Sequence, residues 1–147
     1  MVLRNIKLHL VTYGKGDYFN IAKFEQIKNK FIKPEGGLWA SPVNVSYGWI
    51  NWCKDNDFGD LSSNFEFVFI GNIFKIDSVR HAALMPWVKL LDTSIKYPDF
   101  EKMVSLGCDA IYLTAKGEAE TRFSNPSLYG WDCESVLVMN PKCINIK

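Results

Sequence analysis

The sequence lacks the usual marks of a metal centre or a disulfide framework. Only two histidines are present, and the four cysteines form no CxxC pair: Cys53, Cys108, Cys133 and Cys143. Structural zinc sites take four cysteine or histidine ligands, usually in closely spaced pairs. We therefore expect no metal. We expect the cysteines to be buried thiols, because unpaired cysteine is among the most buried residue types.

Long apolar runs and blocks of one charge are also missing. No stretch approaches the ~20 apolar residues of a membrane-spanning helix. Lys7 and His9 interrupt the apolar start, which lacks a cleavage site of small residues. We therefore expect a cytoplasmic protein with no membrane partner. The net charge is +1 without a basic block, so charge does not indicate nucleic acid, although a small folded patch is compatible with it.

Apolar and aromatic residues are plentiful, at 48% and 14% of the chain. This composition is typical of a folded globular protein and far from that of disordered chains. A length of 147 residues is that of one domain, and no linker, repeat or low-complexity tract divides it. We therefore expect a single domain over residues 1–147.

Hydrophobic periodicity predicts strands and helices in an α+β order. Strands are expected at 2–12, 64–76, 110–114, 134–139 and 143–146, the second either bulged or a hairpin because of Gly71. Helices are expected at 18–31, 42–55, 78–91 and 99–107. Ser41 is the expected N-cap of the second helix, with Pro42 in its first turn. The polar segment 115–130 shows no period and is expected to be a functional or mobile loop.

The common catalytic motifs are absent, namely GxGxxG, the P-loop, GxSxG and HExxH. A scattered set of polar and aromatic residues remains. It consists of His9 on the first strand, the segment Gly37-Leu38-Trp39-Ala40-Ser41, Tyr47, and Glu134 at the head of a late apolar strand. In this order the set resembles the ADP-ribosyltransferase fold family, in the His-aromatic-Glu branch of diphtheria toxin and the poly-ADP-ribose polymerases.

The resemblance implies two small packed β-sheets with flanking helices, and NAD as substrate without a metal. Glu134 would be the catalytic residue, stabilising the oxocarbenium-like charge formed when nicotinamide leaves the ribose. Trp39 and Tyr47 would sandwich the nicotinamide ring. The other NAD-binding residues implied are His9, Thr12, Gly37 and Ser41, and the acceptor-binding residues are Tyr129, Trp131 and Asp132. His9, Trp39, Tyr47 and Glu134 should then meet in one cleft.

Alternative interpretations stay open. The chain is expected to transfer ADP-ribose to an unknown protein or nucleic-acid acceptor, as a toxin or phage effector would, or to hydrolyse NAD with water as acceptor. It is also compatible with a non-catalytic interaction domain of phage or mobile-element origin. Glu134 is equally readable as a solvated strand-edge residue, Trp39 and Trp131 as core residues, and Ser41 as a helix cap. The acceptor and the oligomeric state are left open.

Overall fold

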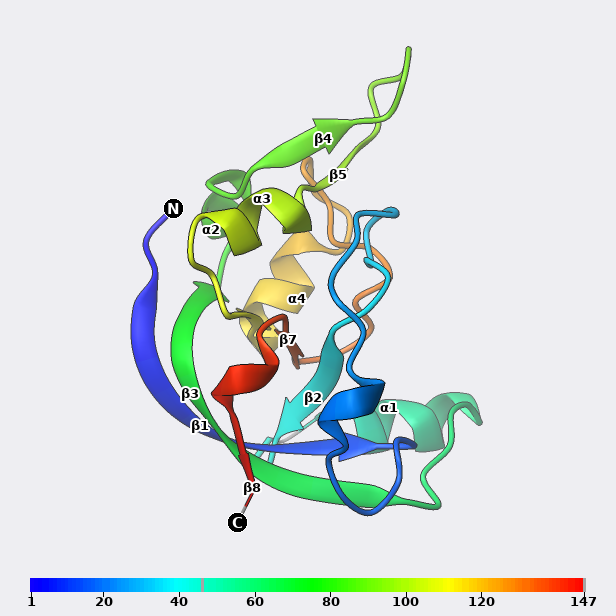
Figure 1. Cartoon of the computed structure of the whole chain (residues 1–147). Helices are drawn as coiled ribbons and strands as arrows, with labels where there is room; N and C mark the ends of the chain where they lie inside the picture. The colour runs from blue at the N-terminus through cyan, green and yellow to red at the C-terminus, as the bar shows by residue number, and fades with distance from the viewer. Residues whose placement is uncertain (46, 147) are drawn as a thin grey trace.

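The chain folds around a strongly curved β-sheet, seen in the computed structural model of residues 1–45 and 47–146 (Figure 1). The strands in these residues are β1 (Arg4–Tyr13), β2 (Leu38–Pro42), β3 (Asn64–Ile76), β4 (Trp87–Lys89), β5 (Lys96–Pro98), β6 (Ala110–Leu113), β7 (Ser135–Val138) and β8 (Ile144–Ile146). The helices are α1 (Trp49–Asn56), α2 (Val79–Ala83), α3 (Phe100–Ser105) and α4 (Ala115–Thr121), with 3-10 turns at Ile21–Lys23 and Pro141–Cys143. The predicted α+β class is confirmed.

Five of the strands close into a barrel. β1 pairs antiparallel with β2 along one edge and with β3 along the other, and the order β1-β2-β7-β6-β3 returns to β1. The 13-residue β3 permits closure, because its other edge has room for β6 at residues 73–76 and for β8 at residues 67–69. The structure therefore has a closed barrel and a separate β4–β5 hairpin where the resemblance implied two packed sheets.

Strand alternation divides the core into two layers. All five barrel strands send alternate side chains inward, namely Leu10, Leu38, Ala40, Phe65, Phe67, Phe69, Ala110, Val136 and Val138. The residues between them on β3, β6 and β7 pack outward against the helices, and this layer includes Phe74, Ile76, Ile111, Leu113, Leu137, Ala82, Phe100 and Met103. β6 and β7 thus present one face to the barrel interior and the other to the covering elements, whereas the outward residues Lys7 and His9 of β1 are exposed.

Three predicted helices are wrong in extent. The region 18–31 contains only the 3-10 turn Ile21–Lys23, and its Phe19 and Phe24 pack against the barrel core. Residues 38–42 form β2, so Ser41 and Pro42 lie in a strand and α1 begins only at Trp49. The predicted helix over 78–91 ends at Ala83, ahead of Pro86 and β4. Ser46, which the second predicted helix included, lies outside the residues that the structure describes.

The region 115–130 opens with α4 instead of a loop. Thr114 caps this helix through its hydroxyl oxygen, which accepts from the Gly117 amide at 3.0 Å. A Cβ on Gly117 would lie 2.1 Å from the Ile76 carbonyl oxygen, so glycine permits the close approach of α4 to β3. Because glycine disfavours a helix interior by about 1 kcal/mol, the sequence gives only a weak indication of this helix. All helices in the described residues are too short or too polar to cross a bilayer.

Candidate functional site

A cavity of about 480 Å³ lies against β1, β2 and the segments around them. We call it the aromatic cavity, because its walls carry seven aromatic side chains: Tyr13, Phe19, Phe24, Trp39, Trp49, Phe65 and Trp131. Three lysines and two carboxylates share the lining, namely Lys15, Lys23, Lys33, Glu25 and Asp132. Its volume falls in the usual range of small-molecule sites, and a mostly apolar lining with a few polar groups is typical of them.

Trp39 and Trp131 form one wall of the aromatic cavity. Their ring centroids are 4.7 Å apart and their planes cross at 78°, an edge-to-face arrangement that aromatic pairs favour. Trp131 is 2% exposed, and its indole nitrogen donates to the Ile32 carbonyl oxygen at 2.9 Å. Trp131 is therefore a fixed wall, and the partly buried Trp39 presents the more accessible ring.

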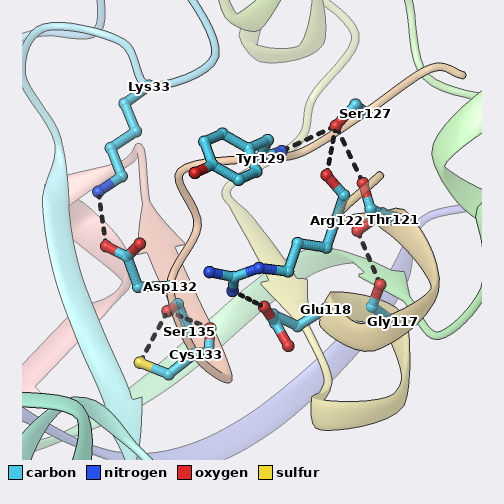
Figure 2. Close-up of polar contacts among 10 residues, drawn as sticks. All are labelled: Lys33, Gly117, Glu118, Thr121, Arg122, Ser127, Tyr129, Asp132, Cys133 and Ser135. Atoms are coloured by element: carbon cyan, nitrogen blue, oxygen red, sulfur yellow. Dashed lines mark hydrogen bonds and ion pairs between the residues drawn. The ribbon is translucent and has the colours of Figure 1, made fainter. Parts of the chain in front are cut away.

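The lysines give the aromatic cavity a positive side. Lys33 Nζ lies 5.7 Å from the Trp39 ring centroid and 3.5 Å from Asp132 Oδ2, and Figure 2 shows this ion pair. Lys15 and Lys23 have no ion-pair partner in the part of the chain that the structure describes. An anionic group entering the cavity would therefore meet two unpaired lysines, together with the carboxylate of Glu25, which is also unpaired among residues 1–45 and 47–146.

The hydroxyl groups of Thr12 and Ser41 line this cavity but already hold the local chain. Thr12 Oγ1 donates to the Trp39 carbonyl oxygen at 3.0 Å, and Ser41 Oγ accepts from the Trp49 amide at 3.3 Å. Gly37 also lines the cavity and has φ +75°. A Cβ on Gly37 would lie 2.8 Å from Ile27 Cδ1 and 2.9 Å from Leu137 Cδ1, so packing against the core explains this glycine.

Glu134 and His9 line a different and more open hollow of about 500 Å³. This strand-end hollow is formed by Lys7, Leu8, His9, Pro42, Val43, Asn44, Val45, Tyr112 and Glu134. The Tyr112 hydroxyl donates to Glu134 Oε2. Burial, together with this hydrogen bond, raises the pKa of the Tyr112 phenol well above its ordinary value. Tyr112 therefore stays protonated at neutral pH and holds the Glu134 carboxylate in place.

The sequence-predicted residues lie at two different places along the strands. β2 and β7 pair with Ala40 opposite Val136, and Val136 faces the barrel interior. Glu134 is two residues before Val136 and shares that inner face at the barrel's end, whereas Ser135 between them lines the aromatic cavity. A shift of one residue along a strand exchanges its faces. The expected single cleft for His9, Trp39, Tyr47 and Glu134 is thus not formed: His9 and Glu134 line one site, Trp39 lines the other, and Tyr47 lines neither.

Two predicted residues line neither site. The Tyr47 hydroxyl donates to Asp55 Oδ2 at 2.7 Å, and this hydrogen bond, with some burial, raises the Tyr47 pKa to about 12. Tyr129 is 57% exposed, with its ring centroid 5.5 Å from the Arg122 guanidinium carbon (Figure 2). Both tyrosines are therefore committed to surface contacts of their own.

The cavity also contains a thiol that does not act as a nucleophile. Cys133 is 4% exposed, and burial raises its pKa to about 11, so at neutral pH it remains a thiol and not the reactive thiolate. Among residues 1–45 and 47–146, no three His, Cys, Asp or Glu side chains are grouped to hold a metal ion.

Sequence reasoning missed the cavity's cations. Lys23 lies in a segment predicted as a helix, and Lys15 and Lys33 lie outside the predicted strands and helices. A lysine is an ordinary surface residue in any such segment, and only the path of residues 14–37 across β1 and β2 brings the three together. Tyr112, which holds Glu134, was read only as part of an apolar strand.

In comparisons with known proteins, no family model, curated protein or solved structure matches the chain.

Proposed function

We propose that this chain binds a nucleotide in the aromatic cavity, and NAD is the first ligand to test. The observation that carries the proposal is the combination of the Trp39–Trp131 wall with three lysines in one cavity of about 480 Å³. A nucleotide joins a planar base to anionic phosphate, and these two parts match the two kinds of lining group. Bases stack favourably on aromatic side chains, and lysine is a common phosphate ligand.

The polar groups of the cavity favour an anion over a neutral heterocycle. Lys33 is partly neutralised by Asp132 at 3.5 Å, whereas Lys15 and Lys23 are not paired within the described residues. A buried aromatic wall alone would accept many planar molecules, so the lysines supply the selection for phosphate. Adenosine should therefore bind more weakly than AMP, and both should need Trp39.

Calorimetry with AMP, adenosine and NAD tests this proposal. Trp39→Leu should weaken AMP binding by about 5- to 150-fold, since a base stacked on an aromatic side chain contributes about 1–3 kcal/mol. Phe123→Leu is the matched control, because Phe123 is 83% exposed and lines neither site. Wild-type protein that binds none of the three ligands, or a Trp39→Leu variant that binds AMP normally, would refute nucleotide binding here.

A second candidate is cleavage of NAD at the strand-end hollow, with ADP-ribosyl transfer as the reaction. The specific observation that favours it is a carboxylate held by a tyrosine in a hollow that His9 also lines, where β2 ends and β7 begins. The resemblance of the sequence to the ADP-ribosyltransferase fold family supports this candidate. It requires the nicotinamide-bearing ribose to occupy the hollow and not the aromatic cavity.

The chemistry of this candidate is a substitution at the ribose carbon C1′. The bond from C1′ to the nicotinamide nitrogen breaks, its electron pair leaves with nicotinamide, and a macromolecular nucleophile forms the new bond to C1′ and loses its proton. Glu134 would stabilise the positive charge that develops on the ribose. With water as the nucleophile the same step is NAD hydrolysis.

Release of nicotinamide from NAD tests this candidate. Glu134→Gln removes the charge but keeps the size of the side chain, and should abolish release if the hollow is catalytic. Labelled NAD in a cell lysate then separates transfer from hydrolysis, because only transfer labels a protein or nucleic acid. Binding without any nicotinamide release would leave the chain as a non-catalytic nucleotide-binding domain.

A further inference from the structure

The β4–β5 hairpin projects from the barrel and ends in an apolar tip. Figure 1 shows this hairpin extending beyond α3 and the neighbouring loops. Its tip, residues 90–95, exposes 40% of Leu90, 86% of Leu91 and 48% of Ile95. Isolated exposed leucines are common on protein surfaces, but three large apolar residues on one protruding turn form a patch that marks interaction sites.

Hydrogen bonds hold this tip in a defined shape. The Leu90 amide donates to the Ile95 carbonyl oxygen at 2.8 Å, and the Thr93 amide donates to the Leu90 carbonyl oxygen at 3.1 Å. The Thr93 hydroxyl also donates to the Leu90 carbonyl oxygen at 2.9 Å. At the hairpin's base, the Trp87 indole donates to the Ala82 carbonyl oxygen at 2.8 Å. The apolar side chains are thus presented by an ordered turn on an anchored stem.

Two lysines face each other just behind the tip. Lys89 and Lys96 are directly opposite in the β4–β5 register, and both side chains are exposed. Neither has an ion-pair partner among the described residues. Like charges directly opposite on paired strands are destabilising. An anionic surface next to the hairpin would remove this repulsion, while Asp92 in the turn is the one acidic side chain of the tip.

We propose that the β4–β5 hairpin docks the protein on an anionic lipid surface. Leu90, Leu91 and Ile95 would enter the interfacial layer of the bilayer, and Lys89 and Lys96 would lie among the anionic headgroups behind them. Lysine side chains near a bilayer extend towards the headgroups in this way, and each basic residue near an anionic membrane contributes about 1 kcal/mol. A protruding turn reaches a flat surface without a membrane-crossing helix, and independently of nucleotide binding.

Co-sedimentation with lipid vesicles tests the docking. The full chain should pellet with vesicles of equal parts phosphatidylcholine and phosphatidylglycerol, and not with phosphatidylcholine alone. Leu91→Ser should lower the vesicle partition coefficient at least tenfold, since the variant no longer buries a leucine side chain in the bilayer. Lys89→Gln with Lys96→Gln should also reduce it about tenfold. About 1 M NaCl, where the Debye length falls to about 3 Å, should weaken wild-type binding strongly.

Leu84→Ser is the matched control, because Leu84 is 55% exposed but lies outside the hairpin. It should bind anionic vesicles as the wild type does, and thermal unfolding should show all variants folded. Wild-type protein that stays in the supernatant with anionic vesicles overturns the proposal, and indicates that the tip serves a protein partner instead. Equal binding by Leu91→Ser and Leu84→Ser would overturn it as well.

Discussion

The aromatic cavity and the strand-end hollow share two strands but differ in almost every physical respect. The cavity is walled by tryptophans, one of them buried and hydrogen-bonded, and its charge comes from lysines on separate segments. The hollow is more open, and its central feature is the Glu134–Tyr112 hydrogen bond. One site is suited to holding a planar anion, and the other to placing a carboxylate beside a reacting group. Glu134, directly before β7, and Ser135, its first residue, line different sites.

The largest effect that separates the two regions should be on stability. Trp131→Ala should lower the free energy of unfolding by about 3–5 kcal/mol, because it opens a void behind Trp39 in the cavity wall. Urea denaturation followed by circular dichroism measures it. Tyr129→Ala, at a 57% exposed position nearby, should cost less than about 1 kcal/mol. Equal losses in the two variants would show that Trp131 does not anchor the cavity.

Variants in the two regions should affect different properties, catalysis in the strand-end hollow and nucleotide binding in the aromatic cavity. If NAD is cleaved at the hollow, Glu134→Gln should lower the rate of nicotinamide release about a hundredfold or more, the usual cost of removing a transition-state electrostatic contact. The same variant should bind AMP in the aromatic cavity normally, whereas Trp39→Leu should lose AMP binding. Rate measurements and calorimetry on both variants test this. Loss of AMP binding in Glu134→Gln would mean that the two regions act as one site.

The cavity lysines should make nucleotide affinity depend on salt. Lys15→Gln with Lys23→Gln should weaken AMP binding about tenfold, because charged contacts to phosphate contribute about 1 kcal/mol or less each at exposed positions. Lys116→Gln is the control, since Lys116 pairs with Glu120 on α4, away from the cavity. Calorimetry at low and high salt measures both. A double variant with wild-type salt dependence would exclude these lysines from phosphate binding.

The smallest expected effect lies in the hollow. Tyr112→Phe removes the hydrogen bond to Glu134 and should lower the free energy of unfolding by about 1 kcal/mol at neutral pH. The folded-state pKa of Tyr112 is raised above its unfolded value of about 10. The folded protein therefore favours the protonated phenol, and this contribution is complete below pH 10 and is lost as the pH rises towards the folded pKa.

Urea denaturation over alkaline pH measures this dependence. Above about pH 10, where free tyrosine ionises, wild-type protein should lose stability more steeply than Tyr112→Phe. Tyr129→Phe should follow the wild-type curve, because Tyr129 makes no contact with Glu134. Parallel curves for wild type and Tyr112→Phe would contradict a stabilising Tyr112–Glu134 bond.

Strands with strong alternation were predictable from the sequence, and so were the starts of two short helices. β1, β6 and β7 lie within or next to their predicted ranges. Ser78 and Asp99 cap α2 and α3 through their side chains. β3 is one continuous strand despite Gly71, where a Cβ would lie 2.6 Å from Cys143 Sγ. The glycine makes room for a packed neighbour and does not interrupt pairing.

The predictions that failed depended on contacts between distant segments. The spacing of Phe19 and Phe24 suggested a helix, but both side chains instead pack on the barrel core. Ser41 suggested a helix N-cap, and its hydroxyl does accept from the Trp49 amide, but from a strand across a turn. The local sequence pattern alone does not show whether a serine caps the helix that directly follows it or reaches a helix that starts several residues later.

The sequence by itself determined the α+β composition of the fold, the apolar faces of its main strands and the burial of its cysteines. These follow from periodicity and residue type, which act locally. Only the tertiary structure decided that the strands close into a barrel, that residues 14–37 bring three lysines to a tryptophan wall, and that Glu134 lines a separate hollow. Strand register sets such placements, and a register is defined only when two strands meet.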